Sequence, residues 1–174
     1  MKNHFFLPIK TSLIFVLYTF LSTSCSSPPQ TTTNNMSSIH IVDRNGLTET
    51  ITSKERLKQY ERKNFLQSQP FQKVTRTYTP DPQGNTLSFI TGYHLNGQPK
   101  QYLELLNSRA KGAYREWYPS GEAKLEAFVI GGVADLNTAA EESWLFDGQS
   151  QAWDEKGKLL ATINYNKGVL QGPR

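Results

Sequence analysis

The sequence predicts a mainly β protein, an antiparallel meander of repeated β-hairpins with a short N-terminal helix. From Phe71 onward, short stretches rich in aromatic and β-branched residues alternate with glycine-containing turns, a pattern typical of hairpins. The glycines of these turns recur at a fixed spacing, which indicates a repeat architecture. A helix signal is found in one segment, before the repeats begin.

Residues 1–24 have the order of a secretory signal peptide. Lys2 and Lys10 precede an apolar run over residues 12–21, and small polar residues follow it. The run is about half as long as the ~20 apolar residues that a membrane-spanning helix needs. We therefore expect this segment to be cleaved after export rather than to remain as a membrane span.

The predicted signal peptide ends before Cys25, the only cysteine of the chain, which therefore has no disulfide partner within it. The residues Ser22-Thr23-Ser24-Cys25 resemble the lipobox of bacterial lipoproteins. That resemblance implies that Cys25 is the lipidation site, that it carries acyl chains such as palmitate, and that cleavage leaves it as the first residue. The alternatives are an unmodified thiol and a soluble exported protein cut near the same place.

Residues 25–38 are polar, uncharged and nearly free of side chains that fill a core. This composition predicts a flexible tether. In lipoproteins of double-membrane bacteria, serine rather than aspartate after the lipidated cysteine goes with transport to the outer membrane, and Ser26 matches that pattern. We expect the protein in the bacterial cell envelope, lipid-anchored to a membrane, with the outer membrane favoured over the inner.

The charge of the exported part is close to neutral. Removing Lys2 and Lys10 from the 19 basic side chains leaves 17, against 15 acidic ones. The basic residues form no run that follows a nucleic-acid backbone. We expect no nucleic-acid partner; the expected partners are a membrane, reached through the lipid anchor, and a protein whose identity the sequence does not give.

Residues 39–70 are predicted to form an N-terminal strand and a capping helix. The strand lies at residues 39–47 and has a turn at Asn45-Gly46. The residues Thr52-Ser-Lys-Glu55 have the form of a capping box, so we expect a helix over 53–66.

Three apolar residues, Leu57, Tyr60 and Phe65, share a face of that predicted helix. Lysine and arginine occupy much of the rest, so one interpretation is a basic helix that touches anionic lipid. Glutamates lie between the basic residues, and we favour packing of the apolar face as a cap on the repeats.

Residues 71–174 are predicted to be the β-hairpin repeats. Gly97 and Gly121 are 24 residues apart, and a longer offset of 36 points to an insertion of 12 residues. Residues 133–142 lack hairpin character and locate the insertion. The offset of 36 relates one pair of tryptophans and three pairs of glycines: Trp117 and Trp153, Gly112 and Gly148, Gly121 and Gly157, Gly132 and Gly168.

The repeat resembles the MORN repeat (membrane occupation and recognition nexus), in the variant form of the YwqK-type antitoxin proteins. The residues that carry the resemblance begin at Gly112-Ala-Tyr-Arg-Glu-Trp117 and at Gly148-Gln-Ser-Gln-Ala-Trp153. Together with Asp43-Arg-Asn-Gly-Leu47, they also resemble repeat lipoproteins of chlamydiae. The resemblance implies stacked hairpins that share one core, because a single hairpin cannot bury its apolar face alone.

Aromatic residues recur in the repeats, and we expect Trp117, Tyr118, Trp153 and Tyr165 to fill the space between hairpins. The alternative is an exposed aromatic platform for carbohydrate or peptide.

The sequence contains little that predicts catalysis. It has no nucleophile elbow, phosphate-binding loop or dinucleotide fingerprint. The histidines, His4, His40 and His94, have no ligands at metal spacing. The acidic pairs Glu141-Glu142 and Asp154-Glu155 are interpreted as solvated. We expect no enzyme activity, no catalytic residue, no metal and no cofactor.

The sequence therefore predicts a lipoprotein that presents a non-catalytic hairpin module for protein binding or an envelope structural role. The alternative, implied by the resemblance alone, is an antitoxin or immunity protein that neutralises a toxin partner. Export to the envelope argues against an intracellular toxin. Lipid binding by the repeats is not favoured, because no basic stripe recurs at consistent repeat positions.

Overall fold

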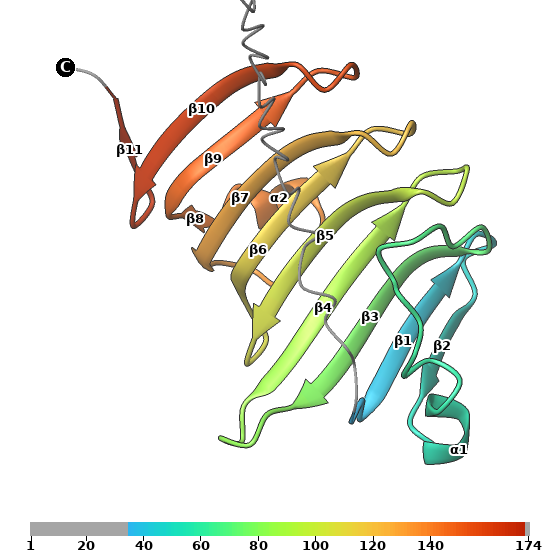
Figure 1. The fold of residues 1–174 in the computed structure, drawn as a ribbon. Helices are drawn as coiled ribbons and strands as arrows, with labels where there is room; N and C mark the ends of the chain where they lie inside the picture. Colours follow the sequence, from blue (N-terminus) through green and yellow to red (C-terminus); the bar gives the residue numbers. More distant parts are fainter. Residues whose placement is uncertain (1–34, 173–174) are drawn as a thin grey trace, which may run out of the picture. The chain divides into compact units, whose positions relative to one another are not determined.

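In the computed structural model, which describes residues 35–172, the chain forms one open sheet of 11 strands (Figure 1). Every paired neighbour is antiparallel. The mainly β, antiparallel meander predicted from the sequence is confirmed. The predicted signal peptide, Cys25 and most of the predicted tether lie outside the described residues.

The elements follow one another in short steps along the chain. The first half contains β1 (Ser38–Asp43), β2 (Thr48–Ile51), α1 (Lys54–Leu57), β3 (Gln72–Pro80), β4 (Thr86–Tyr93) and β5 (Pro99–Leu106). The second half contains β6 (Arg109–Trp117), β7 (Ala123–Gly131), α2 (Thr138–Glu141), β8 (Leu145–Phe146), β9 (Gly148–Trp153), β10 (Leu159–Asn166) and β11 (Val169–Gln171).

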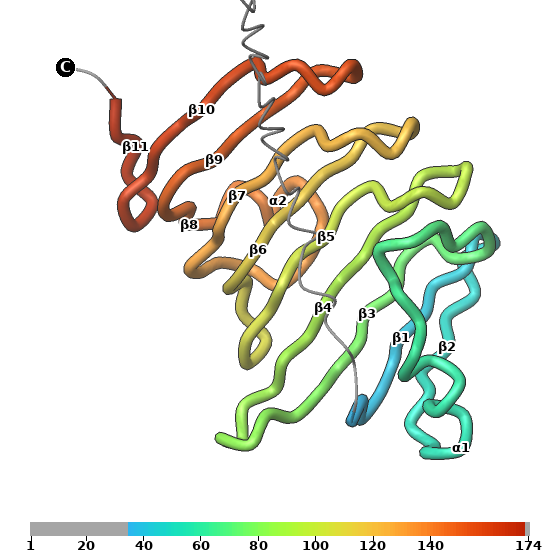
Figure 2. Tube along the Cα trace, in the orientation of Figure 1, coloured from blue at the N-terminus to red at the C-terminus, as the bar shows by residue number. Residues whose placement is uncertain are grey.

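The order of strands across the sheet nearly repeats their order in the sequence. It runs β11-β10-β9-β7-β6-β5-β4-β3-β1-β2, with β8 also paired to β7. The exception is β1, which lies between β2 and β3. Figure 2 shows the resulting back-and-forth path of the chain.

Five of the hairpin turns share one backbone geometry. In the turn of β4 and β5, the N–H of His94 donates to the carbonyl of Gln98, and the N–H of Gly97 donates to the carbonyl of His94. The glycine has a φ of 89°, which costs little without a Cβ. The same pair of bonds closes the turns at 43–47, 81–85, 118–122 and 154–158.

Four of these turns, at 43–47, 94–98, 118–122 and 154–158, lie along one side of the sheet, which we call the turn edge (Figure 1). The other side holds two-residue turns. Asn107 and Ser108, with φ of 48° and 60°, join β5 to β6, and Lys167-Gly168 joins β10 to β11. Residue 108 precedes Gly132 by one 24-residue period, so β4 and β5 form a further copy of the repeat.

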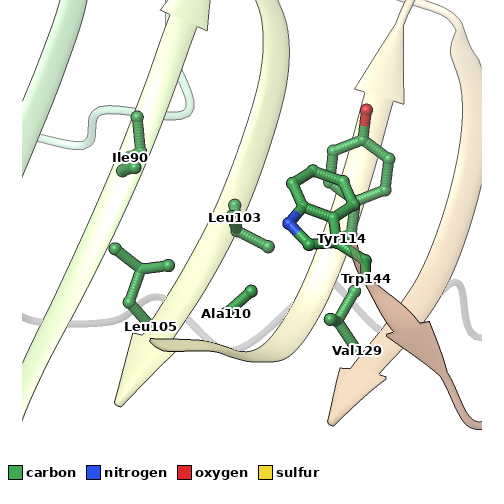
Figure 3. Close-up of a cluster of buried hydrophobic side chains, with 7 residues drawn as sticks. All are labelled: Ile90, Leu103, Leu105, Ala110, Tyr114, Val129 and Trp144. Atoms are coloured by element: carbon green, nitrogen blue, oxygen red, sulfur yellow. The ribbon is translucent and has the colours of Figure 1, made fainter. Parts of the chain in front are cut away.

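The predicted insertion at 133–142 extends in the structure to residue 144, just before β8. This insertion of 12 residues, 133–144, contains α2 and covers one face of the sheet. Trp144, at its end, is 5 % exposed and packs edge-on against Tyr114, with ring centroids 4.7 Å apart. Leu136 and Ala134 pack against the same core cluster. Figure 3 shows the centre of this cluster: Ile90, Leu103, Leu105, Ala110, Tyr114, Val129 and Trp144.

The N-terminal helix is shorter than the sequence predicts. It contains Lys54–Leu57, and its N-cap is Ser53, whose Oγ accepts from the N–H of Arg56 at 3.4 Å. The predicted capping box at Thr52 and the predicted helix over 53–66 are therefore wrong. The side chain of Asn64 accepts from the N–H of Leu66 at 2.9 Å, a local bond that competes with helical hydrogen bonding.

The segment after α1 nevertheless packs over β1 and β2. Leu57 is 2 % exposed and joins a second cluster with Ile39 and Ile51, and the rings of Tyr60 and Phe65 pack against it. The hydroxyl of Tyr93 on β4 donates to the carbonyl of Phe65 at 2.9 Å. The residues predicted to share a helix face thus do pack together, on a chain of irregular turns.

The folded part begins earlier than the predicted tether boundary at residue 38. Met36 is 5 % exposed within the second cluster, and Ser38 already belongs to β1. The N–H of Ser37 donates to the carbonyl of Tyr78 at 2.8 Å. Met36 is the one large apolar side chain of residues 25–38, and its burial adds it to the core of the folded part.

The two coverings lie on opposite faces of the sheet. On β4, Ile90 belongs to the cluster below the insertion, whereas its neighbour Thr91 is buried on the side of Tyr93 and Phe65. Successive side chains of a strand point to opposite faces. The segment after α1 therefore covers one face near the N-terminal end, and the insertion covers the other face over the central strands.

Candidate functional site

The histidines singled out in the sequence have structural partners in the described part of the chain. His40 Nδ1 lies 2.9 Å from Thr50 Oγ1 across the β1 and β2 pair. His94 Nε2 lies 2.8 Å from the carbonyl of Trp117, and because a carbonyl only accepts, this nitrogen carries a proton. His4 and Cys25 lie outside the described residues. Within 35–172, no group of three His, Cys, Asp or Glu residues is placed to hold a metal ion.

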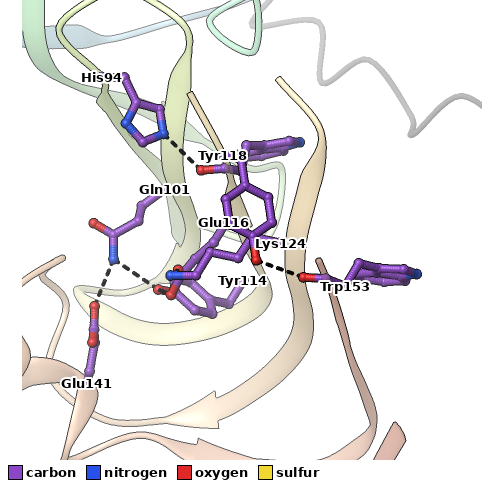
Figure 4. Close-up of polar contacts among 9 residues, drawn as sticks. His94, Gln101, Tyr114, Glu116, Tyr118, Lys124, Glu141 and Trp153 are labelled. Atoms are coloured by element: carbon purple, nitrogen blue, oxygen red, sulfur yellow. Dashed lines mark hydrogen bonds and ion pairs between the residues drawn. The ribbon is translucent and has the colours of Figure 1, made fainter. Parts of the chain in front are cut away.

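His94 and Tyr118 occupy equivalent positions in successive repeats and make equivalent bonds along the turn edge. Tyr118 Oη donates to the carbonyl of Trp153 at 2.9 Å, as His94 does to that of Trp117. The two donors, His94 and Tyr118, are 24 residues apart in the sequence. The two acceptors, Trp117 and Trp153, are 36 residues apart, so the pairs show the two offsets of the repeat. Figure 4 shows both bonds, each of which joins one hairpin to the next.

The aromatic residues expected to fill the space between hairpins are not the core aromatics. Trp117, Tyr118, Trp153 and Tyr165 are all half-buried. The buried aromatic side chains are instead Tyr93, Tyr102, Tyr114 and Trp144. Of the predicted set, Tyr165 packs against Phe146 with ring centroids 5.4 Å apart, and Tyr118 reaches the next hairpin through its hydroxyl.

A polar network joins the insertion to the sheet (Figure 4). Tyr114 Oη donates to Glu116 Oε1 at 2.6 Å, and Gln101 Nε2 donates to Tyr114 Oη at 3.0 Å and to Glu141 Oε1 at 2.8 Å. Lys124 Nζ lies 2.7 Å from Glu116 Oε2. Glu141, predicted to be solvated, is thus a hydrogen-bonded side chain of α2.

The electrostatics of this network favour a structural role. Burial, reinforced by the hydrogen bond to Glu116, raises the pKa of Tyr114 above its usual range. The hydrogen bond to Glu116 likewise raises the pKa of Lys124. Tyr114 therefore stays a neutral donor and Lys124 a cation, so each keeps the proton that its bond to Glu116 uses.

The other predicted acidic pair belongs to a turn. Asp154 Oδ1 accepts from the N–H groups of Lys156 and Lys158, both at 2.9 Å. Asp43 and Asp81 make the equivalent two bonds in their own turns. A hydrogen bond from the Asn85 side chain is the first cause of the lowered pKa of Asp81. These aspartates stabilise the turns.

Six large apolar side chains are exposed at the β8–β11 end of the sheet. We call this group, which includes side chains on both faces, the terminal surface: Leu145, Leu159, Leu160, Ile163, Val169 and Leu170, each between 39 % and 63 % exposed. Neither β10 nor β11 contains a buried residue. β11 pairs with β10 on one side, and its other side has no partner within residues 35–172. Sequence analysis missed this surface, because the alternation of the last hairpin resembles that of the covered ones.

No family model, curated protein or solved structure matches this chain. The candidate site therefore rests on the residues themselves. In the described part, no helix is long and apolar enough to cross a membrane. What the terminal surface offers chemically is an apolar patch next to an open row of backbone hydrogen-bonding groups.

Proposed function

We propose that this protein is a lipid-anchored module of the bacterial cell envelope that binds another protein through its terminal surface. The observation that carries the proposal is the edge strand β11, which has no second strand partner within residues 35–172 and lies beside exposed apolar side chains. Val169 and Leu170 of β11 are 63 % and 61 % exposed. An unpaired strand presents N–H and C=O groups to which an extended segment of another chain can pair.

The edge strand β11 lacks most of the usual protection against pairing. Natural edge strands are blunted by lysine, proline, bulges or short length. The sequence of β11, Val-Leu-Gln, contains no lysine or proline, and of these protections β11 has only its length of three residues. The opposite edge of the sheet differs, because β2 reads Thr-Glu-Thr-Ile and Glu49 pairs with Arg56 on α1 at 2.6 Å. The two edges thus differ in the chemistry they present, and β11 is the one suited to an apolar strand.

The terminal surface continues the core of the sheet outward. Phe146 of β8 packs against the central cluster and contacts Tyr165, and the side chain of Leu145 lies under the turn at Gly168. A partner strand with alternating apolar residues would extend this layer by burying Leu170 and Ile163. Burial of exposed apolar area stabilises such a complex by about 25 cal/mol per Å² before ordering costs.

The anchor is part of the proposal and rests on the sequence. Lipid on Cys25, followed by a polar tether, would hold the module close to the membrane while it turns freely. A flexible chain of about ten residues has a root-mean-square reach of roughly 16–19 Å.

The anchor is tested by the intact mass of the protein extracted from membranes, next to a Cys25→Ala variant. We expect a mass that fits Cys25 as the first residue plus acyl chains, and loss of membrane association in the variant. An unmodified mature chain would refute the anchor and favour the soluble antitoxin alternative.

The binding surface is tested with Leu170→Lys, which places a charge on the edge strand, and with Leu47→Lys as the matched control. Leu47 is 71 % exposed and lies in the β1 and β2 turn. A photo-crosslinking residue at position 171 should give a discrete adduct with one envelope protein, lost with Leu170→Lys and kept with Leu47→Lys. Equal yields in both variants would contradict the proposal.

A further inference from the structure

A pocket of about 400 Å³ lies at the turn edge, far along the sheet from the terminal surface. Its lining comes from the β1 and β2 turn, from β3 and from the β4 and β5 hairpin. The residues are Arg44, Lys73, Tyr93, His94, Leu95 and Lys100. Three of the six are cations, and none is acidic.

The two lysines have uncommitted charges. Lys73 and Lys100 are both exposed. Within residues 35–172, neither side chain makes a hydrogen bond, an ion pair or a cation–π contact. Lys124, by contrast, is paired with Glu116 at 2.7 Å. Lys156 and Lys158 are exposed without such a partner too, so what distinguishes Lys73 and Lys100 is the pocket that they share with Arg44. Like charges that share one pocket repel one another, and an anion between them removes that repulsion.

Arg44 is the fixed cation of the pocket. Its Nε donates to the carbonyl of Pro70 and its Nη2 to the carbonyl of His94. These two carbonyls precede β3 and begin the β4 and β5 turn, so the guanidinium is held between elements that also supply Lys73 and Lys100. A guanidinium has five N–H donors, and the Nη1 group is not used by either bond. A donor that is already positioned loses little entropy when a ligand arrives.

The remaining lining residues make an apolar wall. The hydroxyl of Tyr93 is committed to Thr75 and to the carbonyl of Phe65, so its ring is what the pocket meets. Leu95 is 93 % exposed. His94 directs its protonated Nε2 to Trp117, which leaves Nδ1 for other contacts.

We infer that this pocket binds a phosphate group. Two exposed lysines and one fixed arginine approach one volume from three elements, and this arrangement matches the tetrahedral oxygens of a phosphate group better than a planar carboxylate. The phosphate is carried either by a soluble phosphomonoester or by a phospholipid headgroup, and the chemistry of the pocket is the same for both.

Lysine footprinting tests the inference on the full lipidated protein. An amine acetylating reagent labels exposed lysines, and mass spectrometry reads each position. Lys73 and Lys100 are the reporters, and Lys156 and Lys158, exposed in the β9 and β10 turn, are the internal controls. One arm adds glycerol 3-phosphate to the protein in neutral detergent. The other compares nanodiscs of phosphatidylcholine with nanodiscs that also contain phosphatidylglycerol.

We expect labelling of both reporters to slow about tenfold when the ligand is at about ten times its Kd, because only the free state reacts. Protection by glycerol 3-phosphate assigns a soluble ligand, and protection in the phosphatidylglycerol discs alone assigns a headgroup. Lys73→Ala should abolish the protection of Lys100, whereas Lys156→Ala should leave it unchanged. No protection in either arm, or equal slowing at Lys156 and Lys158, overturns the inference.

Discussion

Gly132 shows how a single residue determines where the chain can leave the sheet. Its φ is 135°, and a Cβ at this position would lie 2.6 Å from Trp144 Cδ1 and 2.9 Å from the carbonyl oxygen of Ser143. Gly148 also has a positive φ, 71°, yet a Cβ there would meet nothing within 4 Å. Both glycines belong to the sequence repeat, but for different physical reasons.

Gly132→Ala is expected to destabilise the protein more than Gly148→Ala. The positive φ costs each variant about 1 kcal/mol, and Gly132→Ala adds overpacking against Trp144 of about 1–3 kcal/mol. The free energies of unfolding in urea give the comparison. Equal losses in the two variants would show that Trp144 moves aside without cost.

Two buried tyrosines make the stability depend on alkaline pH. Burial is the first cause that raises the pKa of Tyr93 and of Tyr114 above the usual value of 10.0. The folded state therefore keeps both protons at a pH where the unfolded chain releases them. Their contribution to stability is complete below pH 10 and is lost as the pH rises above it.

We expect the free energy of unfolding to fall above pH 10 by up to about 1.4 kcal/mol per pH unit for each tyrosine. The measurement is urea unfolding at several pH values between 8 and 11. A Tyr93→Phe/Tyr114→Phe double variant should have a shallower slope, whatever its stability at pH 8. An unchanged slope in that variant would assign the alkaline loss to other groups, such as Lys124.

At the scale of elements, the insertion covers one face of the sheet and does not merely interrupt the repeat. It supplies Trp144, Leu136 and Ala140 to one face of the sheet, and Glu141 of α2 fixes it to Gln101 on β5. Deleting residues 133–144 would restore the 24-residue period, since Leu145 then takes the place that Arg109 has in the preceding copy.

We expect that deletion to destabilise the protein although it regularises the repeat. Loss of the Trp144 side chain alone costs about 3–5 kcal/mol, and the deletion also exposes Leu103 and Tyr114. Trp144→Ala is the matched control, with a smaller expected loss. Thermal unfolding and the binding of an apolar dye test both; a deletion variant as stable as the parent would refute the covering role.

The elements also show what the sequence could predict. Turns that contain glycine could be predicted reliably, because few other residues adopt a positive φ. Every turn predicted in this way is present. The turn at Asn107-Ser108 was missed for the same reason: it has no glycine, although asparagine tolerates this conformation. The helix after Ser53 was predicted too long: it ends at Leu57, and in the irregular segment beyond it the carbonyl of Phe65 accepts from the hydroxyl of Tyr93, which is distant in sequence.

The candidate sites were less predictable than the fold. Lys73 and Lys100 belong to different strands and meet Arg44 because of strand pairing, which no local pattern reveals. Sequence reasoning placed the aromatic core at Trp117 and Trp153 because those two recur. The buried position belongs to Tyr114 and to Trp144 of the insertion, which has no counterpart in the repeat.

At the scale of the whole molecule, burial falls off toward the β11 end of the sheet. β4 and β5 contain fully buried side chains, whereas β10 and β11 contain none. Local stability in a repeat array follows the contacts between neighbours.

Amide hydrogen exchange should therefore be slowest in β4–β6 and fastest in β10 and β11, with β9 between them. Mass spectrometry of peptides from each hairpin measures this directly. Uniform protection across the sheet would mean that the terminal hairpin is stabilised by contacts other than those described. Slower exchange in β10 and β11 on addition of a partner would locate the bound segment.

If the protein passes a membrane before it folds, as we propose, the sequential order of the strands has a consequence. A chain that emerges residue by residue presents each new hairpin to a neighbour that is already in place, from β3 through β10. The pairing of β1 is completed later, because its second partner, β3, begins about thirty residues after β1 ends. Under that proposal, assembly can keep pace with translocation, and β11 emerges after the other described strands.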